Sequence, residues 1–243
     1  MPQRRASASF HLVCSDEPRN GKTLYARLLA DYLILCDRPP LIFDASSGVG
    51  GYFIVRSQKV DLSRAAGQMA VFDRALEPPI RDCVVDLPAE RLSETAGLMR
   101  TIGFAEAARS HGLGVVVHYL VDRTLDSLFA GRNTRSNIDP DRFIIVRNEA
   151  IVPTIIEPGA LRRYDELARE GQVIIPLAGA RTMEAIEDDT FSFSHFARNP
   201  QTVAFFSRGD IKSFLARIYE QFDELGLATD FADGREFRRV REL

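Results

Sequence analysis

One stretch near the start of the chain, residues 9–36, restricts the possible folds more than any other. A short apolar segment at 10–13 predicts a strand, and apolar residues at helical spacing over 24–35 predict a helix. Between them lies Asn20-Gly21-Lys22-Thr23, which matches the end of the phosphate-binding pattern G-x-x-x-x-G-K-[ST]. A strand, a loop of this kind and a helix, in that order, favour an α/β fold with a parallel sheet.

The residues of this loop suit the binding of phosphate groups. Backbone N–H groups of such a loop, together with the helix dipole, attract an anion, and Gly21 allows the backbone to approach it closely. Lys22 offers a positive charge to the phosphates and Thr23 a hydroxyl to Mg²⁺. We therefore predict a nucleotide-binding segment at Asn20, Gly21, Lys22, Thr23 and Leu24.

The loop departs from the pattern at its beginning. Asp16 stands where the pattern has its first glycine, and Glu17 follows it. Two carboxylates beside a polyphosphate would repel it. Arg19, in the same loop, is a candidate for compensating charge, although arginine and lysine differ in reach and shape.

The remaining chain alternates apolar strands with helical segments. Strands are predicted at 41–44, 83–88, 114–121, 142–148 and 172–176, and helices at 62–76, 91–110, 124–130, 159–170, 181–187, 191–198 and 208–225. Most of these strands are continuous apolar runs, which are typical of a parallel sheet covered on both faces. The predicted fold is therefore a doubly wound, mostly parallel α/β sheet with helices on both faces. The second and third strands end in Asp44 and Asp86, at the sheet edge where ligands bind in such folds.

The composition is that of an ordinary globular chain. Of 243 residues, 45% are hydrophobic and 27% are charged, with a net charge of −3, which argues against a protein that coats DNA along its whole surface. No apolar run reaches the length of a membrane span, and three isolated cysteines indicate reduced, buried thiols. We expect a cytoplasmic protein without membrane contact.

The predicted organisation is a disordered arm at 1–8, a nucleotide-binding domain at 9–226 and an arginine-rich tail at 227–243. The tail keeps a weak possibility of nucleic-acid contact open. Its arginines are Arg235, Arg238, Arg239 and Arg241.

Four segments occur in an order that characterises one class of nucleotide-binding proteins. They are Gly21-Lys22-Thr23, Val84-Val85-Asp86-Leu87-Pro88, Val146-Arg147-Asn148 and Ile174-Ile175-Pro176. Together they resemble the ParA/MinD class of P-loop ATPases, which carry a deviant Walker A loop in a CobQ/CobB/MinD/ParA nucleotide-binding domain of the SIMIBI type. The resemblance covers residues 9–225.

The resemblance implies roles for individual residues. It implies ATP or ADP with Mg²⁺ as cofactors, with Asp86 holding the ion through water beside Thr23. It also implies that Asn148 contacts the base and that the loop at Pro176 covers it. Asp44 is our third candidate for the metal site, from its position at a strand end.

Two departures from the class concern hydrolysis. Glu17 stands where the class has a second, signature lysine that reaches across a homodimer, and Asp44-Ala45-Ser46 replaces its Asp-x-Asp motif. Loss of a cation or of a group that positions water can slow phosphoryl transfer by orders of magnitude. We expect nucleotide binding with weak or absent hydrolysis, and the nucleotide-sandwich homodimer is an open question.

The class implies a nucleotide-dependent switch that works with a protein partner in DNA partitioning, positioning or conjugal transfer. A narrower similarity to the conjugal-transfer proteins of the TraL family is based on Val116-Val117-His118, Asp126-Ser127-Leu128 and Thr190-Phe191-Ser192-Phe193. Two alternatives stay open: a degenerate P-loop scaffold that binds proteins without nucleotide, and a small-molecule kinase or ligase on the same fold.

Overall fold

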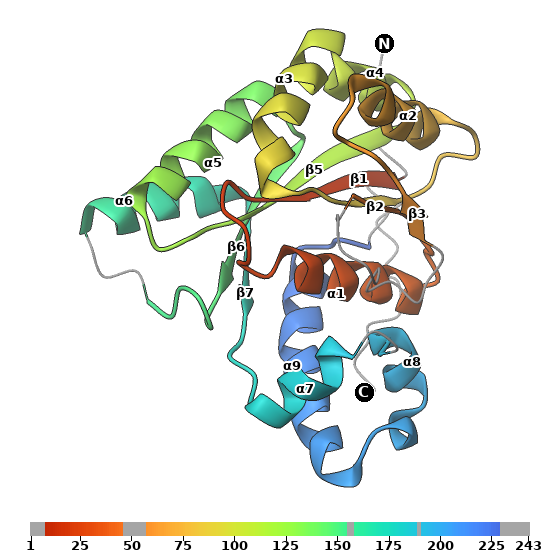
Figure 1. Cartoon of the computed structure of the whole chain (residues 1–243), viewed down its shortest axis with the longest axis vertical. Helices are drawn as coiled ribbons and strands as arrows, with labels where there is room; N and C mark the ends of the chain where they lie inside the picture. Colours follow the sequence, from red (N-terminus) through yellow and green to blue (C-terminus); the bar gives the residue numbers. More distant parts are fainter. Residues whose placement is uncertain (1–7, 46–56, 155–157, 189–190, 229–243) are drawn as a thin grey trace.

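The computed structural model describes residues 8–45, 57–154, 158–188 and 191–228. At its centre lies one sheet of seven strands, all parallel, in the order β3-β2-β4-β1-β5-β6-β7 (Figure 1). The strands are β1 (Ala8–Cys14), β2 (Leu41–Asp44), β3 (Ser57–Lys59), β4 (Cys83–Asp86), β5 (Leu113–Leu120), β6 (Arg142–Asn148) and β7 (Gln172–Ile175).

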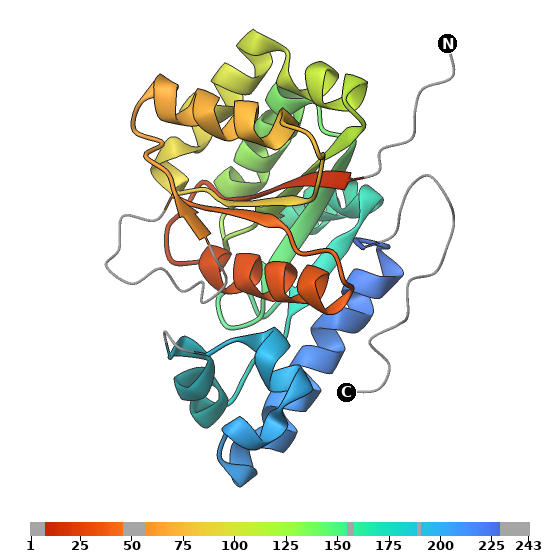
Figure 2. The same ribbon diagram turned by 90° about the vertical axis from the view of Figure 1, so that its right-hand side faces the viewer.

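Helices cover both faces of the sheet (Figures 1 and 2). One face packs against α2 (Ala65–Leu76), α3 (Leu92–Ile102), α4 (Phe104–Ser110), α5 (Leu125–Ile138) and α6 (Pro158–Leu167). The other packs against α1 (Lys22–Leu35), α7 (Ala180–Glu187), α8 (Phe193–Arg198) and α9 (Phe205–Glu224). The doubly wound α/β class predicted from the sequence is confirmed.

Side chains along each strand point alternately to the two faces of the sheet, and each face has its own hydrophobic core. On β1, Phe10 and Leu12 belong to the core under α2–α6, whereas Val13 belongs to the core under α1 and α7–α9. All seven residues of β1 and all eight of β5 are buried. Continuous apolar sequence in these central strands is the consequence of burial on both faces.

Three predicted elements need correction. The helix expected over 91–110 is two helices, because Gly103 takes the left-handed conformation (φ 65°) and ends α3. The helix expected over 124–130 continues to Ile138. Its second half was not predicted because the residues it buries, Gly131, Thr134 and Ile138, form too weak an apolar pattern. Strand β3 was missed because this short segment at the sheet edge is entirely polar.

The boundaries of the other elements differ from the predicted ones by only a few residues. Ala8, placed in the expected N-terminal arm, belongs to β1, and residues 1–7 lie outside the described residues. Helix α2 begins three residues later than expected and α9 three residues earlier. The cysteines Cys14, Cys36 and Cys83 are free and buried, as predicted. Among the described residues no helix combines the length and apolar character that crossing a membrane requires.

Candidate functional site

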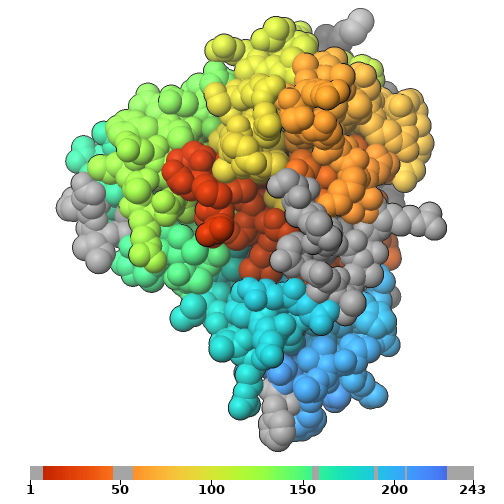
Figure 3. All heavy atoms as spheres, in the orientation of Figure 1, coloured from red at the N-terminus to blue at the C-terminus, as the bar shows by residue number. Residues whose placement is uncertain are grey.

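The candidate site is built on the loop between β1 and α1, residues 15–23, which we call the GKT loop. β1 lies in the middle of the sheet, between β4 and β5, so the loop emerges at the carboxyl edge of the strands. In open parallel sheets this edge is where ligands bind. In the space-filling view the N-terminal residues, coloured red, reach the surface between the upper helices and the lower, cyan part of the chain (Figure 3).

Gly21 is required where it stands. Its φ is +98°, in the left-handed region, and a Cβ there would lie 2.6 Å from Nδ2 of Asn148. The neighbouring Arg19 also has a positive φ, 61°, with its side chain exposed. The loop therefore turns tightly into the first turn of α1, whose first N–H groups have no partner inside the helix.

Hydrogen bonds within the loop fix its shape. Ser15 Oγ donates to the carbonyl of Glu17 (2.8 Å) and accepts from the Glu17 N–H (3.0 Å). The side-chain amide of Asn20 donates to Ser15 Oγ and, at 3.2 Å, to the carbonyl of Leu120 on β5. The Asn20 side chain thus holds the loop against the end of the neighbouring strand.

The carboxylate of Asp16 is hydrogen-bonded on the α5 side of the loop. It accepts from the hydroxyl of Tyr119 (2.6 Å) and from Ser127 Oγ on α5 (2.8 Å). Glu17, by contrast, is exposed to solvent. The two acidic residues of the loop therefore have different environments. Two hydroxyl groups donate hydrogen bonds to Asp16, whereas Glu17 is exposed to solvent.

Lys22 is buried and oriented along the loop. Its Nζ donates to the carbonyl of Glu17 (2.8 Å) and lies 3.4 Å from Oδ1 of Asn20. Burial lowers the pKa of Lys22, and the nearby carboxylate of Asp86 opposes that change. The ammonium group of Lys22 therefore lies inside the loop, next to the Glu17 carbonyl and the Asn20 side chain.

Thr23 and Asp86, two of the residues predicted to lie near the metal, are hydrogen-bonded to each other. Thr23 Oγ1 donates to Oδ2 of Asp86 at 2.6 Å, and Asp44 is the register partner of Asp86 on the adjacent β2. Lys59 on β3 forms an ion pair with Asp44, with 3.0 Å between Nζ and Oδ2. Burial raises the pKa of Asp86 to about 6; Thr23 and Lys22 act against this rise and Asp44 adds to it.

These oxygen atoms suit a small divalent cation. Mg²⁺ prefers carboxylate and hydroxyl oxygens and keeps several waters. Burial is the main cause of the raised pKa of Asp86, and a nearby cation would favour its ionised form. Thr23, Asp86 and Asp44 therefore fit Mg²⁺ by donor type and charge.

Asn148, at the end of β6, lies over the GKT loop. Its Nδ2 is 3.3 Å from the carbonyl of Asn20, and its Oδ1 accepts from the N–H of Ala150 at 3.1 Å. Beside it opens a cavity of about 530 Å³. The walls are Arg19, Gly21, Lys22, Thr23, Leu24 and Arg27 from the loop and α1, Asn148, Ala150 and Ile151 after β6, and Met183, Ile186 and Glu187 from α7.

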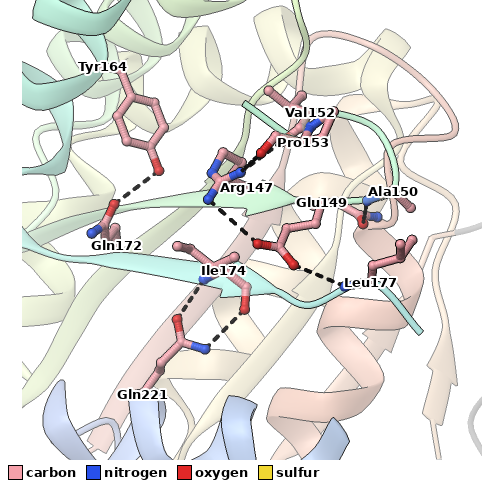
Figure 4. A network of polar contacts seen from close by, with 11 residues as sticks. Arg147, Glu149, Ala150, Val152, Pro153, Tyr164, Gln172, Ile174, Leu177 and Gln221 are labelled. Carbon is pink, nitrogen blue, oxygen red and sulfur yellow. Dashed lines mark hydrogen bonds and ion pairs between the residues drawn. The ribbon is translucent and has the colours of Figure 1, made fainter. Parts of the chain in front are cut away.

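Pro176 is buried at the end of β7 and does not line this cavity; α7, which follows its loop, does. A polar network holds the adjoining segments (Figure 4). Glu149 accepts from the N–H of Leu177 (3.1 Å), and Arg147 donates to the carbonyls of Val152 (2.9 Å) and Pro153 (2.6 Å). The loops after β6 and β7 are thereby fastened beside the cavity.

Sequence reasoning missed several of these residues. Lys59 lies on the polar strand that was not predicted. Met183 and Ile186 have helical spacing, but only the chain path brings α7 beside the GKT loop. Arg27 donates to the carbonyls of Ile186 (2.8 Å) and Phe191 (2.7 Å) and so connects α1 to the α7–α8 segment. No local pattern identifies such a long-range contact.

Segments quoted for the narrower resemblance contribute to the fold. Val116 and Val117 are core residues of β5, Ser192 caps α8, and the N–H of Phe193 donates to Asp31 at 2.8 Å. Thr190, Ser46 and the arginines of the tail lie outside the described residues.

Comparisons with known proteins give little further information. No family model matches the chain, and no curated protein matches it. One solved structure that it resembles is the MinC:MinD cell division protein complex of Aquifex aeolicus, at 12% identity and a TM-score of 0.42, covering 86% of this chain and 95% of that chain. The residues around the GKT loop, not this similarity, support the function proposed next.

Proposed function

We propose that this chain binds a nucleotide, ATP or ADP, together with Mg²⁺, and that the nucleotide state controls its interaction with a protein partner. The observation that carries the proposal is the meeting of four predicted residues from three strand ends: Lys22 and Thr23 beside Asp86, with Asn148 over the loop. A loop, a hydroxyl–carboxylate pair and an adjoining cavity are the parts that a nucleoside polyphosphate with Mg²⁺ needs.

Each part has a separate role. Lys22 and the N–H groups at the start of α1 hold the phosphates, and Thr23 and Asp86, with Asp44 near, hold the cation. When bound, Mg²⁺ neutralises phosphate charge and orients the polyphosphate. The cavity beside Asn148, with apolar Leu24, Met183 and Ile186, accommodates the base.

We further propose that hydrolysis is weak or absent. Glu17, in the place of the signature lysine, is an exposed carboxylate, and a negative charge there does not stabilise a partner's phosphates. Arg19 lines the cavity and supplies a cation within the same chain. From the class resemblance we propose that this switch acts in DNA partitioning, positioning or conjugal transfer.

The alternative function is a scaffold that binds proteins without nucleotide. The observation that favours it is the internal hydrogen bonding of the GKT loop, in which Lys22 donates to the Glu17 carbonyl and Ser15 and Asn20 donate to loop and strand atoms. Under this alternative, the loop keeps the same shape for structural reasons alone.

Calorimetric titration with ADP and with a non-hydrolysable ATP analogue, with and without Mg²⁺, separates the two. We expect Mg²⁺-dependent binding that Lys22→Ala weakens about a hundredfold, because a charge-assisted contact contributes about 3 kcal/mol. Lys212→Ala, on α9 and outside the cavity, should bind like the wild type. Absence of binding by the wild-type protein would refute the nucleotide proposal and leave the scaffold. Phosphate release from ATP then measures any hydrolysis.

A further inference from the structure

A second cavity lies between α5 and α6, away from the cavity beside Asn148. α5 and α6 pack side by side on one face of the sheet (Figure 1). Residues along α5 and from the second half of α6 line a groove of about 490 Å³. It runs from Leu128, near the start of α5, to Asp139 and Pro140 in the loop before β6. We call it the α5–α6 groove.

The groove combines an apolar floor with a cationic rim. Leu128 and Leu167 form buried parts of the floor, and Phe129 is 41% exposed. The guanidinium carbon of Arg163 lies 4.2 Å from the centroid of the Phe129 ring. Arginine and aromatic side chains in one concave patch are the residues that most often dominate the binding energy of protein interfaces.

The charge of the groove differs from that of the whole chain. Four arginines line it, Arg132, Arg135, Arg163 and Arg169, against two carboxylates, Asp139 and Glu166. The chain itself has a net charge of −3. Arg135 pairs with Glu170, and Asp139 pairs with Arg109 from α4, so the rim retains a cationic excess after these ion pairs.

We propose that the α5–α6 groove binds a protein segment that carries both acidic and leucine-like side chains. The acids would pair with the rim arginines, and the apolar side chain would cover Phe129 and the floor. A nucleic-acid backbone fits less well, because it presents charge at every step and would meet Asp139 and Glu166 in the same groove. A peptide carries charge only at some positions, so its acidic side chains can contact the rim arginines without lying next to those carboxylates.

Fluorescence anisotropy with a labelled synthetic peptide, in which aspartate–glutamate pairs alternate with leucine, tests the proposal. We expect Arg163→Glu to weaken binding by about tenfold or more. Arg162→Glu, the same change one residue earlier on an exposed position outside the groove, should leave the affinity near the wild-type value. Equal loss in both variants would reveal a diffuse charge effect and overturn the proposal, as would no binding by the wild type.

A second pair of variants tests the apolar floor. Phe129→Ala should weaken peptide binding several-fold, whereas Leu161→Ala, which removes a similarly exposed apolar side chain on α6 outside the groove, should not. Replacing the peptide's leucines with serine should cause a similar loss. Tighter binding of duplex DNA than of the peptide, lost in Arg163→Glu but kept in Arg162→Glu, would assign the groove to nucleic acid and refute the peptide proposal.

Discussion

Two polar clusters touch helix α1, two residues apart, and they differ in almost every physical property. Around Tyr25, the hydroxyl lies 2.9 Å from Nδ1 of His118, whose Nε2 lies 3.0 Å from Nδ1 of His11. This histidine cluster is sealed within the protein core. Around Thr23 lie Asp86, Asp44 and Lys22, which we call the metal-site cluster after its proposed role. Thr23 and Lys22 line the cavity, whereas the two carboxylates are buried at the carboxyl ends of β4 and β2.

The two clusters differ in the charge that their buried groups carry at physiological pH. Burial lowers the pKa of His11 to about 4 and that of His118 well below its usual range, so both rings are neutral at physiological pH. Asp86 has a pKa of about 6 and stays mostly ionised at pH 7, at a cost to stability. Burial keeps the histidine cluster neutral, whereas Asp86 in the metal-site cluster keeps most of its negative charge at pH 7 beside Lys22.

The largest predicted effect is acid destabilisation through the histidine cluster. The unfolded chain protonates His11 below its ordinary pKa of 6.5, whereas the folded chain does so only near pH 4. The free energy of unfolding should therefore fall as the pH drops through this window, by about 3 kcal/mol for His11 alone. Burial of His118 acts in the same direction. Urea denaturation at several pH values measures the slope.

A matched pair of variants isolates this effect. His11→Asn should reduce the pH dependence, even if it lowers stability overall, because one of the two buried histidines no longer titrates. His111→Asn changes an exposed histidine at the end of α4 and should keep the wild-type slope. Identical slopes in all three proteins would show that His11 does not control acid stability.

The metal-site cluster should behave in the opposite way. Because the pKa of Asp86 is raised from 3.8 to about 6, its ionised form opposes folding at pH 7, and this contribution is relieved as the pH falls through 6. Asp86→Asn should therefore raise the free energy of unfolding without ligand by up to about 3 kcal/mol at pH 7. The advantage should shrink at pH 5, while Mg²⁺-dependent nucleotide binding is lost.

The control for this variant is Asp16→Asn. Its carboxylate already accepts from two hydroxyl groups, and an amide oxygen can accept the same bonds. We expect neither a comparable gain in stability nor a loss of the Mg²⁺ effect. If Asp86→Asn destabilises the ligand-free protein instead, the buried carboxylate is a structural group and the comparison between the two clusters fails.

Local sequence patterns identified the residues of the candidate site, but not the long-range contacts around them. The segment 20–24 and Asp86 follow from local patterns, and the parallel sheet necessarily brings adjacent strand ends together. Neither the histidine cluster nor the α5–α6 groove could be predicted, because each depends on which helices and strands become neighbours. His11 and His118 are 107 residues apart in the chain, and no periodicity indicates that they meet.

Departures from a motif were harder still to interpret from sequence. Asp16 appeared to be an obstacle to phosphate binding, yet Tyr119 and Ser127 hold its carboxylate. Those two donors come from β5 and α5, more than 100 residues away along the chain, which is why the loop sequence alone gave no sign of them. The role of Pro176 beside the base stays a prediction.

The smallest predicted effect compares the two hydroxyl groups of α1 directly. Tyr25→Phe removes the hydrogen bond to His118 and should lower the free energy of unfolding by about 1 kcal/mol. It should leave nucleotide affinity unchanged with or without Mg²⁺, since Tyr25 lies fully buried and does not line the cavity. Thr23→Val removes a hydroxyl two residues earlier and should reduce the gain in affinity that Mg²⁺ provides. Denaturation and calorimetry on both variants measure the two quantities, and a loss of Mg²⁺ dependence in Tyr25→Phe would mean that the two clusters are coupled through α1 rather than independent.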